Sequence, residues 1–488
     1  MTQTLNPPAH MLIDGTWLPS VSGRTFSVED PSVRGRVIAE VARGDGDDVE
    51  RAVAAAAAAF RTWRKTTWTQ RGRALIAIAE QLETSGEELA RTLAGETGAA
   101  IRTQARPEIA LTAEIFRYFG GLTSQLKGET TPLGEGMLSY TRREPWGVVA
   151  AIVPWNAPAS LSAHKIAPAI AAGNTIVIKP SVEAPLTVLA LARICQAHLP
   201  KGVVNVVTGS GADVGMPLAS HPLVRKITFT GNTDTGKALL HVAADRIVPT
   251  TLELGGKSPS LVYADSDDMR VVDGVIAAMR FTRQGQSCSA GSRLFLHQDI
   301  FDSFMSKLAT RVSALKVGDP LDEATDIGSL ANKRQFERVC SFLEDGIAQG
   351  ARAVVGGMPP ASGPLAAGYY ALPTVLADVT PAWRVAREEV FGPVLVAIPW
   401  KDEDEVIRLA NDTHYGLAAY IWSRDLGRAL RAAHEIEAGW IQINQAGRVQ
   451  PGHFFGGQKQ SGLGREGSFE IMLENYTQRK NVTVNIEP

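Results

Sequence analysis

Residues 147–180 read GVVAAIVPWNAPASLSAHKIAPAIAAGNTIVIKP, and this stretch decides the fold class. Two apolar runs, Val148–Val153 and Thr175–Ile178, have the length of buried strands. The segment between them, Ala163–Ala171, is rich in alanine and favours a helix. A buried strand, a helix and a second buried strand in this order predict one βαβ unit of a parallel sheet.

The same alternation continues toward the C-terminus. It predicts further strands and helices at Leu186–His198, Val203–Val207, Gly211–Ala219, Lys226–Phe229 and Thr235–Ala244. A second series between Ser260 and Trp440 includes Leu294–His297, Phe301–Leu315, Lys333–Gln349 and Val394–Pro399. The sequence therefore predicts an α/β protein whose first series forms a doubly wound, parallel sheet.

The segments outside these two series carry weaker patterns. Asp47 followed by Glu50 predicts a capping box at the start of a helix. Other expected elements are helices over Gln70–Leu93 and Pro107–Tyr118, a glycine-rich loop over Gly452–Gly467 and a strand over Val482–Ile486.

Length, charge and cysteine content narrow the functional class. The chain has 488 residues, enough for two or three domains. Its formal net charge of -2 does not indicate the basic surface that binds nucleic acid or an anionic membrane. Three cysteines argue against a disulfide framework, residues 1–15 lack the apolar core of a signal peptide, and the nine histidines lack metal-ligand spacing. We therefore expect a cytoplasmic, metal-free protein whose partner is a small molecule.

The segment QGQSCSAGSR, residues 284–293, surrounds Cys288 with small residues. Small neighbours let a substrate approach a thiolate closely, and a turn there can aim the backbone N–H at an oxyanion. The alternative is an inert, buried cysteine, and we assign that structural role to Cys195 and Cys340 because both lie in helical patterns. Cys288 is the candidate nucleophile.

Glu253 lies between two leucines and before two glycines in TLELGGKSP, residues 251–259. An acid in an apolar setting has its pKa raised toward neutrality, where it can act as a general base. The alternative is a structural carboxylate paired with Lys257. The motif alone leaves both interpretations open.

Two candidate binding features, an asparagine and a glycine turn, follow predicted strands. Asn156 lies between two prolines after Val148–Val153, where its amide suits either an oxyanion hole or a simple turn. Gly231 and Gly236 follow the strand that ends at Phe229, and such a turn lets phosphates approach the first amides of a helix.

Taken in order, seven motifs spread over nearly the whole chain resemble the aldehyde dehydrogenase superfamily. They are Pro154-Trp-Asn156, Lys179-Pro-Ser, Phe229-Thr-Gly231, Glu253-Leu-Gly-Gly-Lys, Gly285-Gln-Ser-Cys288, Glu389-Val-Phe391-Gly-Pro and Phe455-Gly-Gly…Lys459-Gln-Ser-Gly. The resemblance implies NAD(P)-dependent oxidation of an aldehyde to a carboxylic acid. It also implies a Rossmann-like cofactor domain, an α/β catalytic domain and a small β oligomerisation element.

The resemblance assigns a role to each matching residue. Cys288 resembles the nucleophile, Glu253 the base that activates water, and Asn156 the oxyanion donor. The expected contacts of NAD or NADP are Trp155, Lys179, Val182, Glu183, Gly215, Phe229, Gly231, Gly236, Leu254, Glu389 and Phe391. The expected substrate pocket comprises Ala157, Leu161, His164, Ser287, Ser289 and Phe454, with Arg448 as a further polar candidate. Because several of these side chains are small, we expect a wide pocket for a bulky or oxygenated aldehyde.

The resemblance also implies a domain division and an assembly. The cofactor domain is expected at 1–124 and 145–255, and the catalytic domain at 256–450. An oligomerisation element is expected at 125–144 and 470–488, and the glycine-rich loop 451–469 returns from the catalytic domain. We expect a homodimer or homotetramer.

One departure from the family pattern concerns the cofactor. The usual run Lys-Pro-x-Glu places an acid on the ribose 2′-hydroxyl, whereas this chain reads Lys179-Pro-Ser-Val182-Glu183. Val182 takes the position of the acid, and Glu183 comes one residue late. A strict preference for NAD over NADP is therefore not expected.

Three alternatives remain. A CoA-acylating semialdehyde dehydrogenase of the same fold commonly lacks the general base, so Glu253 argues against it. A non-enzymatic structural or binding member is disfavoured by intact Cys288, Glu253 and Asn156. A cysteine-dependent amidase or hydrolase lacks a histidine placed by motif near Cys288.

Overall fold

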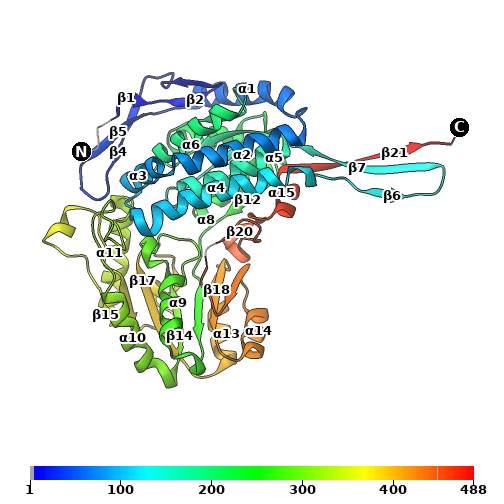
Figure 1. Ribbon diagram of the computed structural model, residues 1–488. Helices are drawn as coiled ribbons and strands as arrows, with labels where there is room; N and C mark the ends of the chain where they lie inside the picture. The colour runs from blue at the N-terminus through cyan, green and yellow to red at the C-terminus, as the bar shows by residue number, and fades with distance from the viewer. Residues whose placement is uncertain (1–4, 448, 488) are drawn as a thin grey trace.

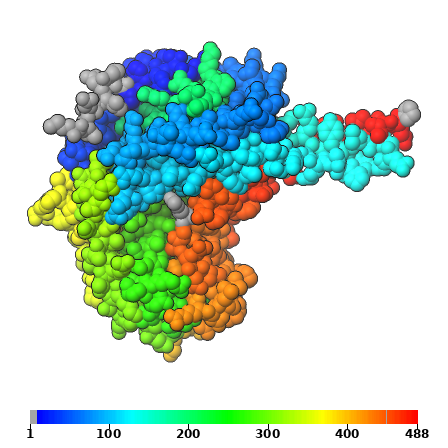
Figure 2. Space-filling model, viewed as in Figure 1, coloured from blue at the N-terminus to red at the C-terminus, as the bar shows by residue number. Residues whose placement is uncertain are grey.

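The structure is a computed structural model that describes residues 5–447 and 449–487. Two lobes are each built on a β-sheet, and a narrow three-stranded arm projects from the upper lobe (Figure 1). The space-filling view shows the arm standing clear of the body (Figure 2). The predicted α/β fold class is confirmed.

An eight-stranded sheet forms the centre of the upper lobe. Its order is β20 (Gly462–Leu463), β12 (Thr250–Glu253), β11 (Val224–Thr230), β8 (Val148–Ile152), β9 (Thr175–Lys179), β10 (Val204–Val206), β2 (Met11–Ile13) and β3 (Thr16–Leu18). The strands from β12 to β10 are parallel. The chain runs from β8 outward to β10 and then returns to the other side of β8 as β11. Open α/β sheets bind ligands at such a switch point, beyond the carboxyl ends of the strands.

Five helices pack on this sheet: α1 (Gly46–Trp63), α5 (Pro158–Ala172), α6 (Pro185–His198), α7 (Met216–Ser220) and α8 (Thr233–Ala244). Four more pack on α5 or α6 as an outer layer: α2 (Trp68–Thr84), α3 (Gly86–Thr97), α4 (Arg106–Gly121) and α15 (Phe469–Tyr476). Every residue of β8 and β9 is buried. Burial on both faces explains why these strands are continuous apolar runs in the sequence.

The lower lobe contains a seven-stranded sheet. Its order is β15 (Arg352–Val355), β16 (Thr374–Ala377), β17 (Val394–Trp400), β14 (Arg293–His297), β13 (Pro259–Val262), β18 (Ala418–Trp422) and β19 (Trp440–Ile443), and all but the edge strand β15 are parallel. Its helices are α9 (Met269–Met279), α10 (Phe301–Ser313), α11 (Lys333–Ala348), α12 (Arg384–Arg387), α13 (Glu403–Asn411) and α14 (Leu426–Glu435).

Two smaller sheets complete the fold. The arm consists of β6 (Thr130–Pro132), β7 (Met137–Pro145) and β21 (Thr477–Asn485), in the order β21-β7-β6. A second three-stranded sheet contains β1 (Leu5–Ala9), β5 (Val37–Ala42) and β4 (Thr25–Glu29). Within the described ranges, no helix combines the length and the apolar character needed to cross a membrane.

Several local predictions were wrong. The capping box of α1 is formed by Asp45 and Asp48, not by Asp47 and Glu50, so the helix begins earlier than expected. The expected helix over Gln70–Leu93 is divided at Ser85, where α2 ends and α3 begins. The expected helix over Gly211–Ala219 is a π-helical turn, η3 (Gly211–Gly215), followed by α7. The sequence analysis also missed strands β1 to β5 and β12.

Candidate active site

Three chain segments meet at the candidate catalytic centre. Asn156 follows β8, Glu253 ends β12, and Cys288 follows the short helix η5 (Phe281–Arg283) of the lower lobe. Asn156 Nδ2 donates to the main-chain oxygen of Gln286 at 3.0 Å, which ties the amide to the cysteine loop. The charge of Glu253 acts on the Cys288 thiol, so these groups are electrostatic neighbours. The structure thus brings together the three residues that were selected as catalytic from the sequence.

Cys288 is half-buried. Burial, followed by the charges of Glu389 and Glu253, raises the pKa of its thiol to about 12, and Arg283 opposes this rise. Among the described residues, nothing accepts a hydrogen bond from the backbone N–H of Cys288. This N–H is therefore available to an oxyanion, beside the Asn156 amide.

Glu253 is a buried acid, 3% exposed, and neither of its carboxyl oxygens has a hydrogen-bond partner in the described part of the chain. Burial and then the charge of Glu466 hold the pKa of this carboxyl well above its usual value. Lys257 does not pair with it, because Lys257 Nζ donates to the main-chain oxygen of Val385 at 2.8 Å. The alternative of a Glu253–Lys257 pair is therefore wrong. A buried, unpaired carboxyl whose pKa is raised from its usual value meets one requirement of an acid–base group that works near neutral pH.

A buried ion pair next to Glu253 was not identified from the sequence. Lys165 Nζ, on α5, lies 2.6 Å from Glu466 Oε1, and both side chains are almost fully buried. Glu466 raises the pKa of Glu253 and Lys165 lowers it, so this pair sets how strongly Glu253 holds a proton. The two residues are 301 positions apart, and no local pattern connects them.

The turn between β11 and α8 fits the phosphates of a dinucleotide. Asn232 caps α8, and the first amides of such a helix bind anions. A Cβ on Gly231 would lie 2.4 Å from the ring of Phe229, and one on Gly236 would lie 2.7 Å from Leu254. These four predicted residues thus form one close-packed turn, in which a larger side chain at either glycine would displace Phe229 or Leu254.

Trp155, Phe391 and Glu389, three expected cofactor contacts, are held in fixed positions by their neighbours. The ring centroids of Trp155 and Phe391 are 5.4 Å apart, edge to face. Phe391 has a left-handed φ of 57°, and Gln335 Nε2 holds this turn by donating to its main-chain oxygen at 2.7 Å. Glu389 Oε1 accepts from the backbone N–H of Gly256 at 3.0 Å, and burial raises the pKa of Glu389 to about 7.

Lys179 ends β9 and is buried at the expected ribose end of the site. Burial lowers the pKa of its ammonium to about 8, and the nearby Glu183 carboxylate opposes this shift. A Cβ on Gly215 would lie 4.0 Å from Lys179 Cδ, so Gly215 borders the same space. The Ser181 hydroxyl donates to the Glu183 carboxylate and fixes its direction.

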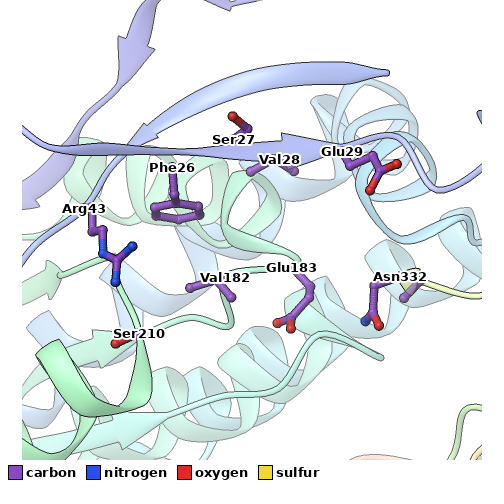
Figure 3. A pocket seen from close by; sticks show the side chains of 10 residues that line it. Phe26, Ser27, Val28, Glu29, Arg43, Val182, Glu183, Ser210 and Asn332 are labelled. Atoms are coloured by element: carbon purple, nitrogen blue, oxygen red, sulfur yellow. The ribbon is translucent and has the colours of Figure 1, made fainter. Parts of the chain in front are cut away.

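Val182 and Glu183 line a cavity of about 350 Å³. Figure 3 shows Val182 beside Arg43 and Ser210, with Glu183 and Asn332 farther along the cavity. Arg43 Nη2 lies 2.9 Å from Asp213 Oδ2, and its side chain is 42% exposed. Arg43 was not identified from the sequence, because it comes from the strand region before α1.

The predicted substrate residues differ in exposure. Ala157 and Ser289 are buried, Leu161, His164 and Ser287 are half-buried, and Phe454 is 54% exposed. Burial lowers the pKa of His164 to about 4, so its ring is neutral at physiological pH, and its Nδ1 has no hydrogen-bond partner among the described residues. Arg448 lies outside the described residues.

Two further expectations concern the buried cysteine Cys195 and the absence of a metal site. Cys195 is fully buried, and burial raises the pKa of its thiol to about 12. Across residues 5–447 and 449–487, no cluster of three or more His, Cys, Asp and Glu side chains is placed to hold a metal ion.

Comparisons with known proteins identify the family. A sequence model of the aldehyde dehydrogenase family matches residues 17–482. The chain is 42% identical over 489 residues to a hydroxyisobutyraldehyde dehydrogenase from Mycolicibacterium austroafricanum, covering 100% of this chain and 95% of that protein. It is 40% identical over 483 residues to an aldehyde dehydrogenase from Deinococcus radiodurans, covering 98% and 93%. The NAD+ complex of an aldehyde dehydrogenase from Bacillus cereus superposes with a TM-score of 0.95 at 36% identity, covering 100% of both chains.

Proposed function

Because the chain belongs to the aldehyde dehydrogenase family, whose members are NAD(P)-dependent oxidoreductases acting on aldehydes, we propose that Cys288, Glu253 and Asn156 carry its chemistry. The observation that carries this assignment is the unpaired, buried Glu253 carboxyl beside the Cys288 thiol. Family membership also argues against a non-enzymatic protein and against an amidase.

The first half of the reaction forms a bond to Cys288. Cys288 first loses its thiol proton to solvent. The thiolate sulfur then adds to the aldehyde carbon, and the carbonyl oxygen becomes an oxyanion. The Asn156 amide and the Cys288 N–H donate to that oxyanion. When bound, the oxidised nicotinamide supplies the acceptor for the hydride of this carbon, which leaves a thioester on Cys288.

The second half releases the acid. Glu253 accepts a proton from water as the water oxygen adds to the thioester carbon. The carbon–sulfur bond then breaks, and the product leaves as a carboxylic acid while Cys288 is regenerated. The Lys165–Glu466 pair beside Glu253 tunes its affinity for this proton. A CoA-acylating enzyme needs no such base, so the position of Glu253 favours hydrolysis over acyl transfer to CoA.

The test is rapid mixing of enzyme, cofactor and aldehyde. Cys288→Ala should lose oxidation by several orders of magnitude while still binding cofactor, because the covalent step is gone. Glu253→Gln should release about one equivalent of reduced cofactor per site and then stall as a thioester. Cys340→Ala, which changes another half-buried cysteine, is the matched control and should behave as wild type. Undiminished turnover in Cys288→Ala would refute the assignment.

We also propose that the enzyme uses NAD with weak discrimination against NADP. Val182 offers no carboxylate to repel a 2′-phosphate. Arg43 lines the same cavity, and guanidinium groups bind phosphates through paired hydrogen bonds. Glu183 and Asp213 keep negative charge nearby, so NADP is tolerated rather than strongly preferred.

For the substrate, we propose a bulky or oxygenated aldehyde. Ala157, Ser287 and Ser289 are small, and the neutral ring of His164, on α5, keeps a buried Nδ1 without a partner among the described residues. The Mycolicibacterium relative is named for an aldehyde that is both branched and hydroxylated. A panel assay tests this: kcat/KM higher for acetaldehyde than for ring-containing or hydroxylated aldehydes would contradict an open pocket.

We further propose a homodimer or homotetramer assembled through the arm, in the cytoplasm. β21 and β6 are the two edge strands of the arm, and an exposed edge strand is a template for pairing with another chain. The three cysteines are free thiols, as expected in a reducing compartment.

A further inference from the structure

An ion pair that takes no part in the proposed chemistry joins the oxyanion turn to the cysteine loop. Glu108, on α4, is 2% exposed, and Arg283 lies five residues before Cys288. Arg283 Nη2 donates to Glu108 Oε2 at 3.3 Å and to the main-chain oxygen of Asn156 at 3.3 Å. One guanidinium therefore links α4, the Asn156 turn and the end of η5.

Glu108 also fixes the helix that follows Asn156. The N-cap residue of α5 is Ala157, whose side chain cannot accept a hydrogen bond. Glu108 Oε1 accepts instead from the backbone N–H of Ala159 at 3.1 Å. A carboxyl group from another helix thus does the work of an N-cap. One oxygen of Glu108 holds α5, and the other holds Arg283.

We infer that Glu108 and Arg283 are a positioning pair that aligns the Asn156 amide with Cys288. This inference rests on the proposed roles of Asn156 and Cys288. Asn156 is held at two points, its side chain by Gln286 and its main chain by Arg283. Donors of an oxyanion hole act only when held within about 0.5 Å of the productive geometry. Loss of the hydrogen bond from Arg283 would leave the Asn156 amide in place but misaligned with Cys288.

Charge gives the pair a second effect, on the thiol. The carboxyls of Glu389 and Glu253 raise the pKa of Cys288, and Arg283 lowers it. Glu108 faces Arg283, and burial raises the pKa of its carboxyl to about 7 while Arg283 lowers it. The geometric and electrostatic effects can be separated by experiment, because lysine keeps the charge of Arg283 without its planar fork.

The experiment uses Arg283→Gln, Arg283→Lys and Glu108→Gln in the full-length enzyme. Two quantities are measured: the burst rate of reduced cofactor at saturating aldehyde, and the rate of Cys288 alkylation by iodoacetamide across pH. Arg283→Gln should slow the burst by about ten- to a hundredfold and slow alkylation as well. Arg283→Lys should restore alkylation but not the burst. Glu108→Gln should slow the burst without slowing alkylation, because Arg283 keeps its charge.

A matched control separates positioning from stability. Glu96 on α3 is also buried and caps α6, by accepting from the backbone N–H of Leu186 at 2.7 Å. Glu96→Gln should lower the melting temperature as Glu108→Gln does and keep the wild-type burst rate at saturating cofactor. Burst rates within about twofold of wild type in both Arg283→Gln and Glu108→Gln would overturn the inference.

The same assay on Cys288→Ala distinguishes two kinds of failure. A burst that survives in Cys288→Ala refutes the proposed chemistry itself. Loss of the burst there, together with normal bursts in the Arg283 and Glu108 variants, refutes only the positioning pair. If Arg283→Gln does not fold, Arg283→Lys still tests the geometry because it preserves the cation.

Discussion

Val182 and Arg43 are the two side chains on which the proposed cofactor choice depends. A carboxylate at the position of Val182 would bond a ribose 2′-hydroxyl and repel a 2′-phosphate, and valine does neither. Arg43 adds a cation to the same cavity from a distant part of the chain. We expect the two residues together to weaken the discrimination against NADP without forming a dedicated site for the 2′-phosphate.

We predict that substitutions at these two positions change the affinity for NADP and leave the affinity for NAD unchanged. Arg43→Gln should raise the Kd of NADP by about tenfold or more and leave that of NAD unchanged, because a charge-assisted hydrogen bond is lost. Val182→Glu should disfavour NADP in the same way. Quenching of tryptophan fluorescence during titration with NAD and with NADP measures both Kd values. Arg24→Gln is the control, since Arg24 pairs with Asp45 and does not line the cavity. A wild-type preference for NAD beyond about a thousandfold would contradict the proposal.

Single functional residues could be predicted where their neighbours in the sequence already indicate the chemistry. Cys288 has small neighbours and Glu253 has apolar ones, so each motif indicates its chemistry locally. Their roles remain predictions, although the family is confirmed. Arg283, Glu108 and Glu466 could not be selected in this way, because each acts through a partner far away in the sequence.

Helices α5 and α6 share a construction that their own sequences do not reveal. Each has an alanine at the N-cap and a proline in its first turn, and neither N-cap side chain accepts a hydrogen bond. The acceptors come from Glu108 and Glu96, on α4 and α3. The central strands could be predicted because they are buried on both faces, as with β8. The strands before α1 could not, because they are short and partly exposed, as with β4.

The buried carboxyl of Glu96, which caps α6, predicts that the stability of the folded chain depends on pH. Burial raises the pKa of Glu96 to about 7, above its value in the unfolded chain. A raised folded-state pKa gives stability that is complete below the unfolded pKa and is lost as pH rises through the folded pKa. The difference in melting temperature between wild type and Glu96→Gln should therefore be largest below pH 4.5 and shrink as the pH rises through about 7. Glu88→Gln, an exposed change on the same helix, is the control and should show no such trend. A constant or growing difference would contradict the assignment.

At the scale of the whole molecule, the arm of β6, β7 and β21 projects from the body of the chain (Figure 1). Leu138 on β7 and Val484 on β21 are paired in register and are 43% and 40% exposed. Apolar side chains that remain this exposed on a protruding sheet support the proposed assembly through the arm. The sequence showed alternation only over Val482–Ile486, whereas the strand runs from Thr477 to Asn485. Its polar, exposed first half has no apolar alternation to reveal it.

Charge on this surface should separate the subunits. Leu138→Asp combined with Val484→Asp places two like charges at facing positions and should convert the oligomer to a 52.2 kDa monomer, as measured by light scattering after gel filtration. Leu223→Asp changes an exposed leucine on the body and should leave the mass unchanged. A wild-type protein that is already monomeric, or a double variant of unchanged mass, would refute assembly through the arm.

The pairing of β7 with β21 also imposes an order on biosynthesis. Pro145 and Thr477 are register partners, as are Met137 and Asn485, so β7 leaves the ribosome more than 300 residues before the strand that completes its ladder. Contacts of such long sequence separation form late. Until residue 485 emerges, the nascent chain lacks β21 of the arm, and before that it also lacks Glu466 and the β20 neighbour of β12. A nascent chain that stops before β21 therefore lacks the complete arm, through which we propose assembly, and one that stops before residue 466 also lacks the ion pair beside Glu253.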